Sequence, residues 1–232
     1  LEDISFKVNK GETIAFIGST GSGKSTLINL IPRFYDATSG EILINGIDVR
    51  DYSFEYLNNI IGYVPQKATL FSGDILSNVS FGNNIDGKPS NKKIADALRV
   101  SQASEFVSKL EDGEKSHIAQ GGTNISGGQK QRLSIARTIA RNPEIYIFDD
   151  SFSALDYKTD STLRRELREY TKDATVMIVA QRIGTILNAD KIVVLDNGKC
   201  VGVGTHNELM KKCKVYKEIA LSQVSKEELE NV

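Results

Sequence analysis

The sequence predicts an α/β fold, with a mixed sheet, an antiparallel β part and an inserted helical region. Three observations support this prediction. The apolar run Thr13–Ile17 is typical of a buried strand, and it leads into a glycine-rich loop and then a helical pattern. Two later apolar runs, Glu144–Phe148 and Thr175–Ala180, alternate with helical patterns, as in a parallel α/β sheet. From Lys67 to Asn142 strand signals disappear and helical patterns dominate.

These patterns indicate one large domain with a subdomain, which suits a chain of 232 residues. We expect residues 1–66 and 143–222 to form an α/β core with the β part, and residues 67–142 to form the helical subdomain. The charged residues 223–232 are expected to form a solvated tail.

Local signals indicate further strands and turns. Alternating apolar residues predict a strand over Leu1–Lys10, and another strand is expected over Ile60–Pro65. Pro32 should end or kink the helix after the glycine-rich loop, because proline removes a helical N–H. The dipeptides Asn45-Gly46 and Asn197-Gly198 predict two hairpins.

Composition excludes several classes of protein. The chain is 40% apolar and 25% charged, which favours a packed core over disorder. Its net charge of −1 gives no sign of a nucleic-acid partner. Cys200 and Cys213 lack the spacing of a metal site, so a reducing environment is the simplest expectation. No apolar run approaches the ~20 residues that a membrane-spanning helix needs.

The glycine-rich loop after Thr13–Ile17 fits the pattern G-x-x-x-x-G-K-[ST]. Its residues are Gly18, Ser19, Thr20, Gly21, Ser22, Gly23, Lys24, Ser25 and Thr26. A helix N-terminus presents unpaired N–H groups, and glycines let the backbone wrap closely around an anion. Lys24 adds a cation for the β- and γ-phosphates, and the Ser25 hydroxyl can ligate Mg²⁺. A glycine-rich turn that matches by chance is the alternative. The strand before the loop and the helix after it favour phosphate binding, with Lys24 also acting in catalysis.

Two carboxylates follow the apolar run that ends at Phe148. In open α/β sheets, ligands bind at the C-terminal ends of the strands. Asp149 can therefore hold the Mg²⁺ that Ser25 also contacts, and Asp150 is placed for the attacking water. The alternative is a pair of helix N-cap residues, since acidic residues suit helix starts. The presence of a phosphate-binding loop favours the metal role for Asp149.

A second glycine-rich stretch precedes a predicted helix over Gln129–Arg141. It contains Ser126, Gly127, Gly128 and Gln129. Ser126 is a natural N-cap or phosphate ligand at this helix start. One nucleotide does not need two anion-binding helix starts from one chain, so a second copy of the protein or a relative would explain the pair. An ordinary glycine-rich loop entering a helix is the alternative.

The order of these motifs resembles the ATP-binding cassette of ABC transporters, over essentially the whole chain. The motifs that carry the resemblance are Gly18–Thr26, Gln66, Ser126–Gln129, Ile145–Asp150 and Ser153–Asp156. The resemblance implies a P-loop NTPase (RecA-like) core, with ATP and Mg²⁺ as cofactors and a second cassette as partner. It implies that Gln66 contacts Mg²⁺ and couples to the membrane domain, and that the Ser126–Gln129 signature closes over the ATP of the partner.

Two segments, Phe71–Ile75 and Ser116–Gly122, resemble the exporter type of cassette. Exporter cassettes are usually fused behind a transmembrane domain. Leu1 is not an initiator methionine, so we expect a piece of a longer polypeptide with such a domain upstream, at the cytoplasmic face of the cell membrane. The aromatic residue that stacks on adenine in this family would then also lie upstream of Leu1.

Two residues depart from the family pattern. Asp150 stands where the family has the Glu that polarises the attacking water, and Gln181 stands where the switch loop carries His. Gln120 also replaces a frequent Glu. The shorter carboxylate arm displaces its oxygens by on the order of 1 Å, which can cost ~100-fold in rate. Gln181 can still bond a γ-phosphate, but it cannot shuttle a proton. Such changes resemble the degenerate half of heterodimeric, multidrug-type exporters.

Other hypotheses remain open at this point. The chain could be an active homodimeric exporter cassette in which Asp150 and Gln181 are neutral drift. A non-transport ABC ATPase of the DNA-repair or translation kind would usually carry a long coiled coil, and residues 67–142 are too short and loop-broken for one. An importer-type cassette expressed as a free subunit is the third alternative.

Overall fold

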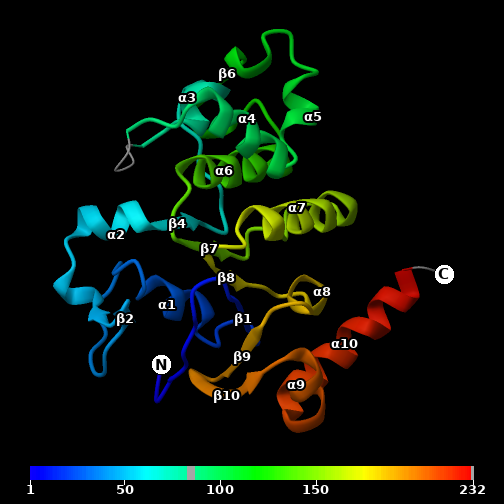
Figure 1. The fold of residues 1–232 in the computed structure, drawn as a ribbon. Coiled ribbons are helices and arrows are strands. Elements are labelled where there is room, and N and C mark those ends of the chain that lie inside the picture. Colours follow the sequence, from blue (N-terminus) through cyan, green and yellow to red (C-terminus); the bar gives the residue numbers. More distant parts are fainter. Residues whose placement is uncertain (83–86, 231–232) are drawn as a thin grey trace. The chain divides into compact units, whose positions relative to one another are not determined.

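The computed structural model describes residues 1–82 and 87–230, and its internal contacts divide the chain into two compact units. The first unit comprises Leu1–Phe54 and Thr175–Val232, and the second comprises Glu55–Ala174. Each unit combines strands with helices (Figure 1). No helix within the described ranges is long and apolar enough to cross a membrane.

The strands of the first unit lie in the order β10-β9-β1-β8. Their bounds are β1 Thr13–Ile17, β8 Thr175–Val179, β9 Lys191–Asp196 and β10 Lys199–Gly204. The central strand β1 runs parallel to both β8 and β9, whereas β10 pairs antiparallel with β9. Residues 14–17 of β1 are almost wholly inaccessible to solvent. Burial on both faces explains why this strand is continuously apolar.

Five helices and a hairpin complete the described part of the first unit. The helices are α1 Lys24–Asn29, η1 Val49–Asp51, α8 Ile183–Ile186, α9 His206–Lys212 and α10 Lys214–Glu230. The hairpin joins β2 Leu43–Ile44 to β3 Ile47–Asp48. Asn45 and Gly46 both have positive φ, of 52° and 81°, as a type I′ turn requires. The second predicted hairpin, β9–β10, turns at Asn197-Gly198 in the same way.

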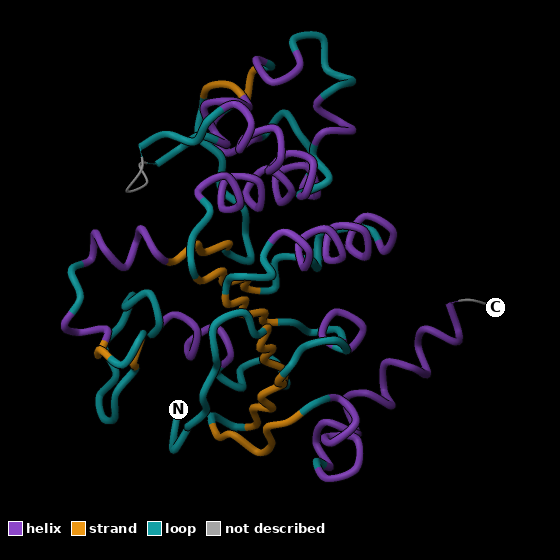
Figure 2. The backbone as a smooth tube through the Cα atoms, viewed as in Figure 1, coloured by secondary structure: helices purple, strands orange, loops and turns teal. Residues whose placement is uncertain are grey.

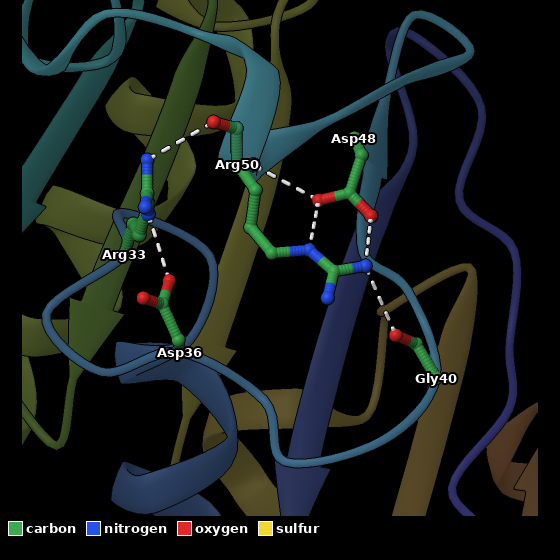
Figure 3. A network of polar contacts seen from close by, with 5 residues as sticks. All are labelled: Arg33, Asp36, Gly40, Asp48 and Arg50. Atoms are coloured by element: carbon green, nitrogen blue, oxygen red, sulfur yellow. Dashed lines mark hydrogen bonds and ion pairs between the residues drawn. The ribbon is translucent and has the colours of Figure 1, made fainter.

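A polar network holds the chain around this hairpin (Figure 3). The Arg50 guanidinium donates to both oxygens of Asp48, at 3.0 and 2.7 Å, and to the Gly40 carbonyl. Arg33 donates to Asp36 and to the Arg50 carbonyl. The Arg50 hydrogen bonds hold the pKa of Asp48 down at about 2. Arg33, Asp36 and Gly40, which follow α1, are thereby linked to Asp48 of β3 and Arg50 of η1.

The second unit pairs β4 Ile61–Val64 in parallel with β7 Ile145–Asp149. Its helices are α2 Phe54–Ile60, α3 Ile75–Val79, α4 Asn91–Val100, α5 Ser104–Val107, η2 Gly113–Lys115, η3 Gln120–Gly122, α6 Gly127–Arg141 and α7 Tyr157–Tyr170. The helix α6, seen as one of the long coils in Figure 2, packs against α3, α4 and β4. Eight of its residues are buried, including Leu133 and Ile139.

The structure differs from the sequence expectations in four local places. The segment Leu1–Lys10 is not a strand: Ile4, Phe6 and Val8 are half-buried in alternation, but a single bridge at Glu2 is its strand pairing among the described residues. Helix α1 ends at Asn29, earlier than expected, ahead of Pro32. The region 67–142 also holds a strand pair, β5 Gly73–Asp74 with β6 His117–Ile118, too short to produce an alternating pattern.

The fourth difference concerns the C-terminal end. The segment expected to be a solvated tail from residue 223 continues as helix α10 to Glu230, and residues 231 and 232 lie outside the described ranges. Lys and Glu are good helix formers, so a charged sequence does not exclude a helix. The side chain of Gln223 also makes two hydrogen bonds within the first unit.

Candidate nucleotide-binding site

The phosphate-binding loop lies in the first unit, between β1 and α1, as predicted. The Lys24 ammonium donates to the carbonyls of Gly18 and Ser19, both at 2.8 Å, and to Ser22 Oγ at 3.4 Å. The loop is therefore wrapped around this cation, while Ser25 and Thr26 are exposed in the first turn of α1. A wrapped, cationic loop with exposed hydroxyls at a helix start is chemically suited to a polyphosphate.

Two glycines show why the loop needs its glycine positions. A Cβ at Gly18 would lie 2.1 Å from the Leu195 carbonyl oxygen, so only glycine lets the loop pass this close to β9. Gly21 has φ +81°, which favours glycine, and no heavy atom lies within 4 Å of the place its Cβ would take. The loop is thus held against the sheet at Gly18 and has open space at Gly21, which fits a bound phosphate.

The switch residue Gln181 also belongs to the first unit and follows β8. The Ala180 N–H donates to the Phe16 carbonyl of β1 at 3.1 Å, which holds the segment before Gln181 beside the strand that leads into the phosphate loop. The Gln181 side chain is exposed. Its own carbonyl accepts a hydrogen bond from Gln223 Nε2 at 2.7 Å. The parallel pairing of β1 with β8 therefore brings the loop and the switch to the same end of the sheet.

The two carboxylates lie in the second unit at the end of β7. Asp149 and Asp150 are buried, with 6% and 7% of their surface exposed. The Tyr63 hydroxyl donates to Asp149 Oδ2 at 3.0 Å, and Gln66 Nε2 donates to Asp150 Oδ2 at 2.9 Å. Burial, followed by the nearby Asp149 charge, raises the pKa of Tyr63, so its hydroxyl stays a donor. Gln66 therefore lies beside the carboxylate end of β7 in the second unit, and its contact with Mg²⁺ stays a prediction.

The alternative role of Asp149 and Asp150 as helix caps is wrong. Helix α7 begins at Tyr157, and its N-cap is Asp156, whose side chain accepts from the Thr159 N–H. Asp150 instead has φ 46°, a left-handed conformation that few non-glycine residues adopt. Its carbonyl accepts from Ser153 Oγ at 2.9 Å, which fixes this turn. Strained backbone of this kind is concentrated at functional sites.

The donor set of the second unit fits a magnesium ion. Magnesium is usually held by one or two carboxylates together with substrate phosphates and water. Asp149 supplies carboxylate oxygens, and Gln66 Oε1 is the amide atom able to ligate a metal while Nε2 bonds Asp150. In the described part of the chain, no three His, Cys, Asp or Glu residues are grouped so that they could hold a metal ion by themselves.

The signature stretch forms the start of α6, also in the second unit. Ser126 is the N-cap: its Oγ accepts from the Gln129 N–H, and Gln129 Oε1 accepts from the Ser126 N–H at 2.9 Å. The first turn contains no acidic residue, and Ser126 and Gly127 are exposed. A Cβ at Gly128 would lie 3.3 Å from the Ala154 carbonyl, so this glycine lets the Ser153–Asp156 loop pack closely. The exposed helix start can therefore receive an anion.

Three positioning residues were missed by the sequence reasoning: Tyr63, Gln131 and Gln223. Gln131 is buried in α6 and donates to the Pro65 carbonyl at 3.2 Å, which joins the signature helix to the segment that carries Gln66. A tyrosine in the otherwise apolar strand before Gln66 was a signal for Tyr63. No local signal marks Gln131 or Gln223, because their partners lie far away in the sequence.

Comparison with known proteins identifies the family. The ABC transporter family model matches residues 1–153 of the 232 residues. The chain is a member of the ABC transporter family. The chain of a solved bacterial Atm1-family ABC exporter with ATP bound superposes with a TM-score of 0.90 at 34% identity, over 95% of this chain and 38% of that chain. This likeness confirms the predicted α/β ABC ATPase fold with its antiparallel and helical parts.

Curated relatives of this chain support the assignment to the ABC transporter family. An uncharacterized ABC transporter ATP-binding protein of Mycobacterium tuberculosis is 50% identical over 223 residues, 96% of this chain and 38% of the relative. YgaD of Bacillus subtilis, named as a multidrug export ATP-binding/permease protein, is 44% identical over 94% of this chain and 37% of its own length. The chain thus spans well under half of the length of each of these relatives.

Proposed function

We propose that this chain acts as the ATP-binding domain of a membrane exporter at the cytoplasmic face of the cell membrane, coupled to a transmembrane domain of the same polypeptide. The relatives support this, because one is named as a fused ATP-binding/permease protein for multidrug export. In the proposal, ATP with Mg²⁺ is enclosed between this domain and a second cassette. No nucleic acid takes part.

The proposed roles follow from the chemistry of each group. Residues 18–26 cradle the phosphates, with Lys24 neutralising charge that develops on the β- and γ-phosphates during transfer. Ser25, Gln66 and Asp149 hold Mg²⁺, which supplies further neutralisation of phosphate charge. Asp150 orients the attacking water, and Gln181 contacts the γ-phosphate. The signature residues 126–129 cover the nucleotide bound by the partner cassette.

We further propose that the nucleotide site on this chain hydrolyses ATP slowly and that the partner is a different chain with Glu and His at these two positions. The observation that carries this is the pair Asp150 and Gln181 beside an intact phosphate loop, Asp149 and signature. Asp150 has a short arm, and its Oδ2 already accepts a hydrogen bond from Gln66. Gln181 carries no titratable group. Both features weaken activation of water while leaving phosphate binding intact.

Restoring the family residues tests the slow site. In the full-length protein, the double change Asp150→Glu with Gln181→His should raise ATP hydrolysis at this site by about 10- to 100-fold, because a displacement of about 1 Å is removed. Single-turnover hydrolysis of radiolabelled ATP, measured by chemical quench, gives the rate. Asp112→Glu, the same change in an exposed turn, serves as the control and should leave the rate unchanged. Turnover by the unmodified protein as fast as that of the double variant would refute the slow site.

A further inference from the structure

The side chain of Gln223 holds the backbone on both sides of Arg182. Its Nε2 donates to the Gln181 carbonyl at 2.7 Å, and its Oε1 accepts from the Ile183 N–H at 2.7 Å. Gln223 belongs to α10, some forty residues further along the chain. One planar amide therefore satisfies a carbonyl and an N–H two residues apart, in the way that a neighbouring strand would.

The contact also replaces a missing helix cap. Helix α8 begins at Ile183, and its N-cap residue Arg182 makes no side-chain capping hydrogen bond. The first N–H groups of a helix have no partner inside the helix. Gln223 Oε1 supplies a partner for the Ile183 N–H. The start of α8 and the backbone of Gln181 are therefore held by the same side chain.

Gln223 is itself placed by the docking of α10. Tyr216 and Ala220 are buried, and with Gln223 they follow the i, i+4, i+7 spacing of one helix face. The Tyr216 hydroxyl lies 2.8 Å from His206 Nδ1 of α9. Just before Gln181 in the chain, the Ala180 N–H donates a hydrogen bond to the Phe16 carbonyl of β1. The backbone of Gln181 is thus held between the strand that enters the phosphate loop and the inner face of α10.

We propose that Gln223 is a positioning residue for Gln181, and that the C-terminal helix α10 thereby tunes how well this site distinguishes ATP from ADP. The inference rests on the proposed function, because it takes Gln181 as the γ-phosphate contact. ADP lacks the γ-phosphate, so a displaced Gln181 weakens the binding of ATP alone. A displacement of α10 would therefore change ATP binding through the two hydrogen bonds of Gln223.

Nucleotide affinity in the full-length protein tests the proposal. Gln223→Leu removes both hydrogen bonds, and the affinity for ATP should fall by about 3- to 10-fold, the range for loss of a net hydrogen bond, while the affinity for ADP stays unchanged. Gln223→Glu keeps the acceptor for Ile183 and loses the donor to Gln181, and it should weaken ATP binding in the same direction. Equilibrium competition against a fluorescent nucleotide gives both affinities. Ser222→Ala, at an exposed position of the same helix, is the matched control.

A double-mutant cycle separates positioning from a general structural role. Once Gln181→Ala has removed the side chain that contacts phosphate, Gln223→Leu should have no further effect on ATP affinity. Equal losses for ATP and ADP, additive losses in the cycle, or no change on Gln223→Leu would each overturn the proposal. If the unmodified protein bound no ATP, or if Lys24→Ala left ATP binding unchanged, the proposed function itself would fail.

Discussion

Ser126 illustrates how one residue serves both the fold and the predicted nucleotide contact. Its Oγ accepts from the Gln129 N–H and so caps α6, but a hydroxyl also has a hydrogen to donate. That hydrogen can reach a phosphate that approaches the exposed helix start. The capping role is present in this structure, and the phosphate role stays a prediction.

Two changes at Ser126 should separate these roles. Ser126→Ala removes the cap and should lower the free energy of unfolding by about 1 kcal/mol. Ser126→Asp keeps a good cap, so stability should be retained, but its negative charge should repel the partner's ATP and abolish ATP-driven closure of the two cassettes. Urea unfolding of the full-length protein and ATP hydrolysis by its complex with the partner chain measure the two effects. Normal hydrolysis by the Ser126→Asp variant would argue against the phosphate contact.

At the scale of elements, the contact between α6 and β4 depends on a small residue. A Cβ at Gly62 of β4 would lie 2.6 Å from atoms of both Thr138 and Pro143, at the C-terminal part of α6 and just beyond it. This glycine has no positive φ to accommodate, so its role is close approach of the helix to the strand. The same helix carries the signature at its other end.

Gly62→Ala should therefore force α6 away from β4. We expect a loss of about 1–3 kcal/mol in the free energy of unfolding, the usual cost of overpacking. Gly184→Ala is the matched control, because no atom lies within 4 Å of its Cβ position and alanine favours helices. Urea denaturation of both variants compares them. Equal stability of the Gly62→Ala variant and the unmodified chain would show that the helix can shift without cost.

At the scale of the molecule, each compact unit carries its own part of the motif set. The first unit holds the phosphate loop and Gln181, and the second holds Gln66, the two carboxylates and the signature. Carboxylates that accept hydrogen bonds in the folded state contribute to acid stability, because they must be protonated as the pH falls. Glu12 is one of them: it accepts from Asn9 just before β1 and from Lys191 of β9 at 2.8 Å.

These bonds make the stability of the chain depend on pH. The Asn9 backbone bond, followed by Lys191, lowers the pKa of Glu12 from 4.5 to about 2 in the folded state. Its stabilisation is therefore complete above pH about 4.5, the unfolded value, and is lost as the pH falls toward about 2. Glu12→Gln should be less stable than the unmodified chain at pH 7, and the difference should shrink below pH about 4.5 and be largely lost near pH 2. Thermal unfolding followed by circular dichroism measures this, with exposed Glu41→Gln as the control. A difference that stays constant with pH would contradict the assignment.

Much of the fold and the motif set could be predicted from local pattern. The strand Thr13–Ile17, the two Asn-Gly hairpins and the Ser126 cap are confirmed, because short-range sterics and hydrogen bonds decide them. The phosphate loop was recognisable for the same reason, since its glycines and Lys24 act within nine residues. The strand expected over Leu1–Lys10 does not form, because alternation of apolar residues alone does not supply a pairing strand.

Contacts between distant residues could not be read from the chain. Gln66 and Asp150 are 84 positions apart, and Gln181 and Gln223 are 42 apart, so only the packing of strands and helices brings each pair together. A glutamine carries no sequence pattern that identifies its hydrogen-bond partner, and Gln223 belongs to the segment expected to be a charged tail. Local chemistry therefore decides where a phosphate can bind, whereas the path of the backbone through the core decides which side chains hold the binding groups in place.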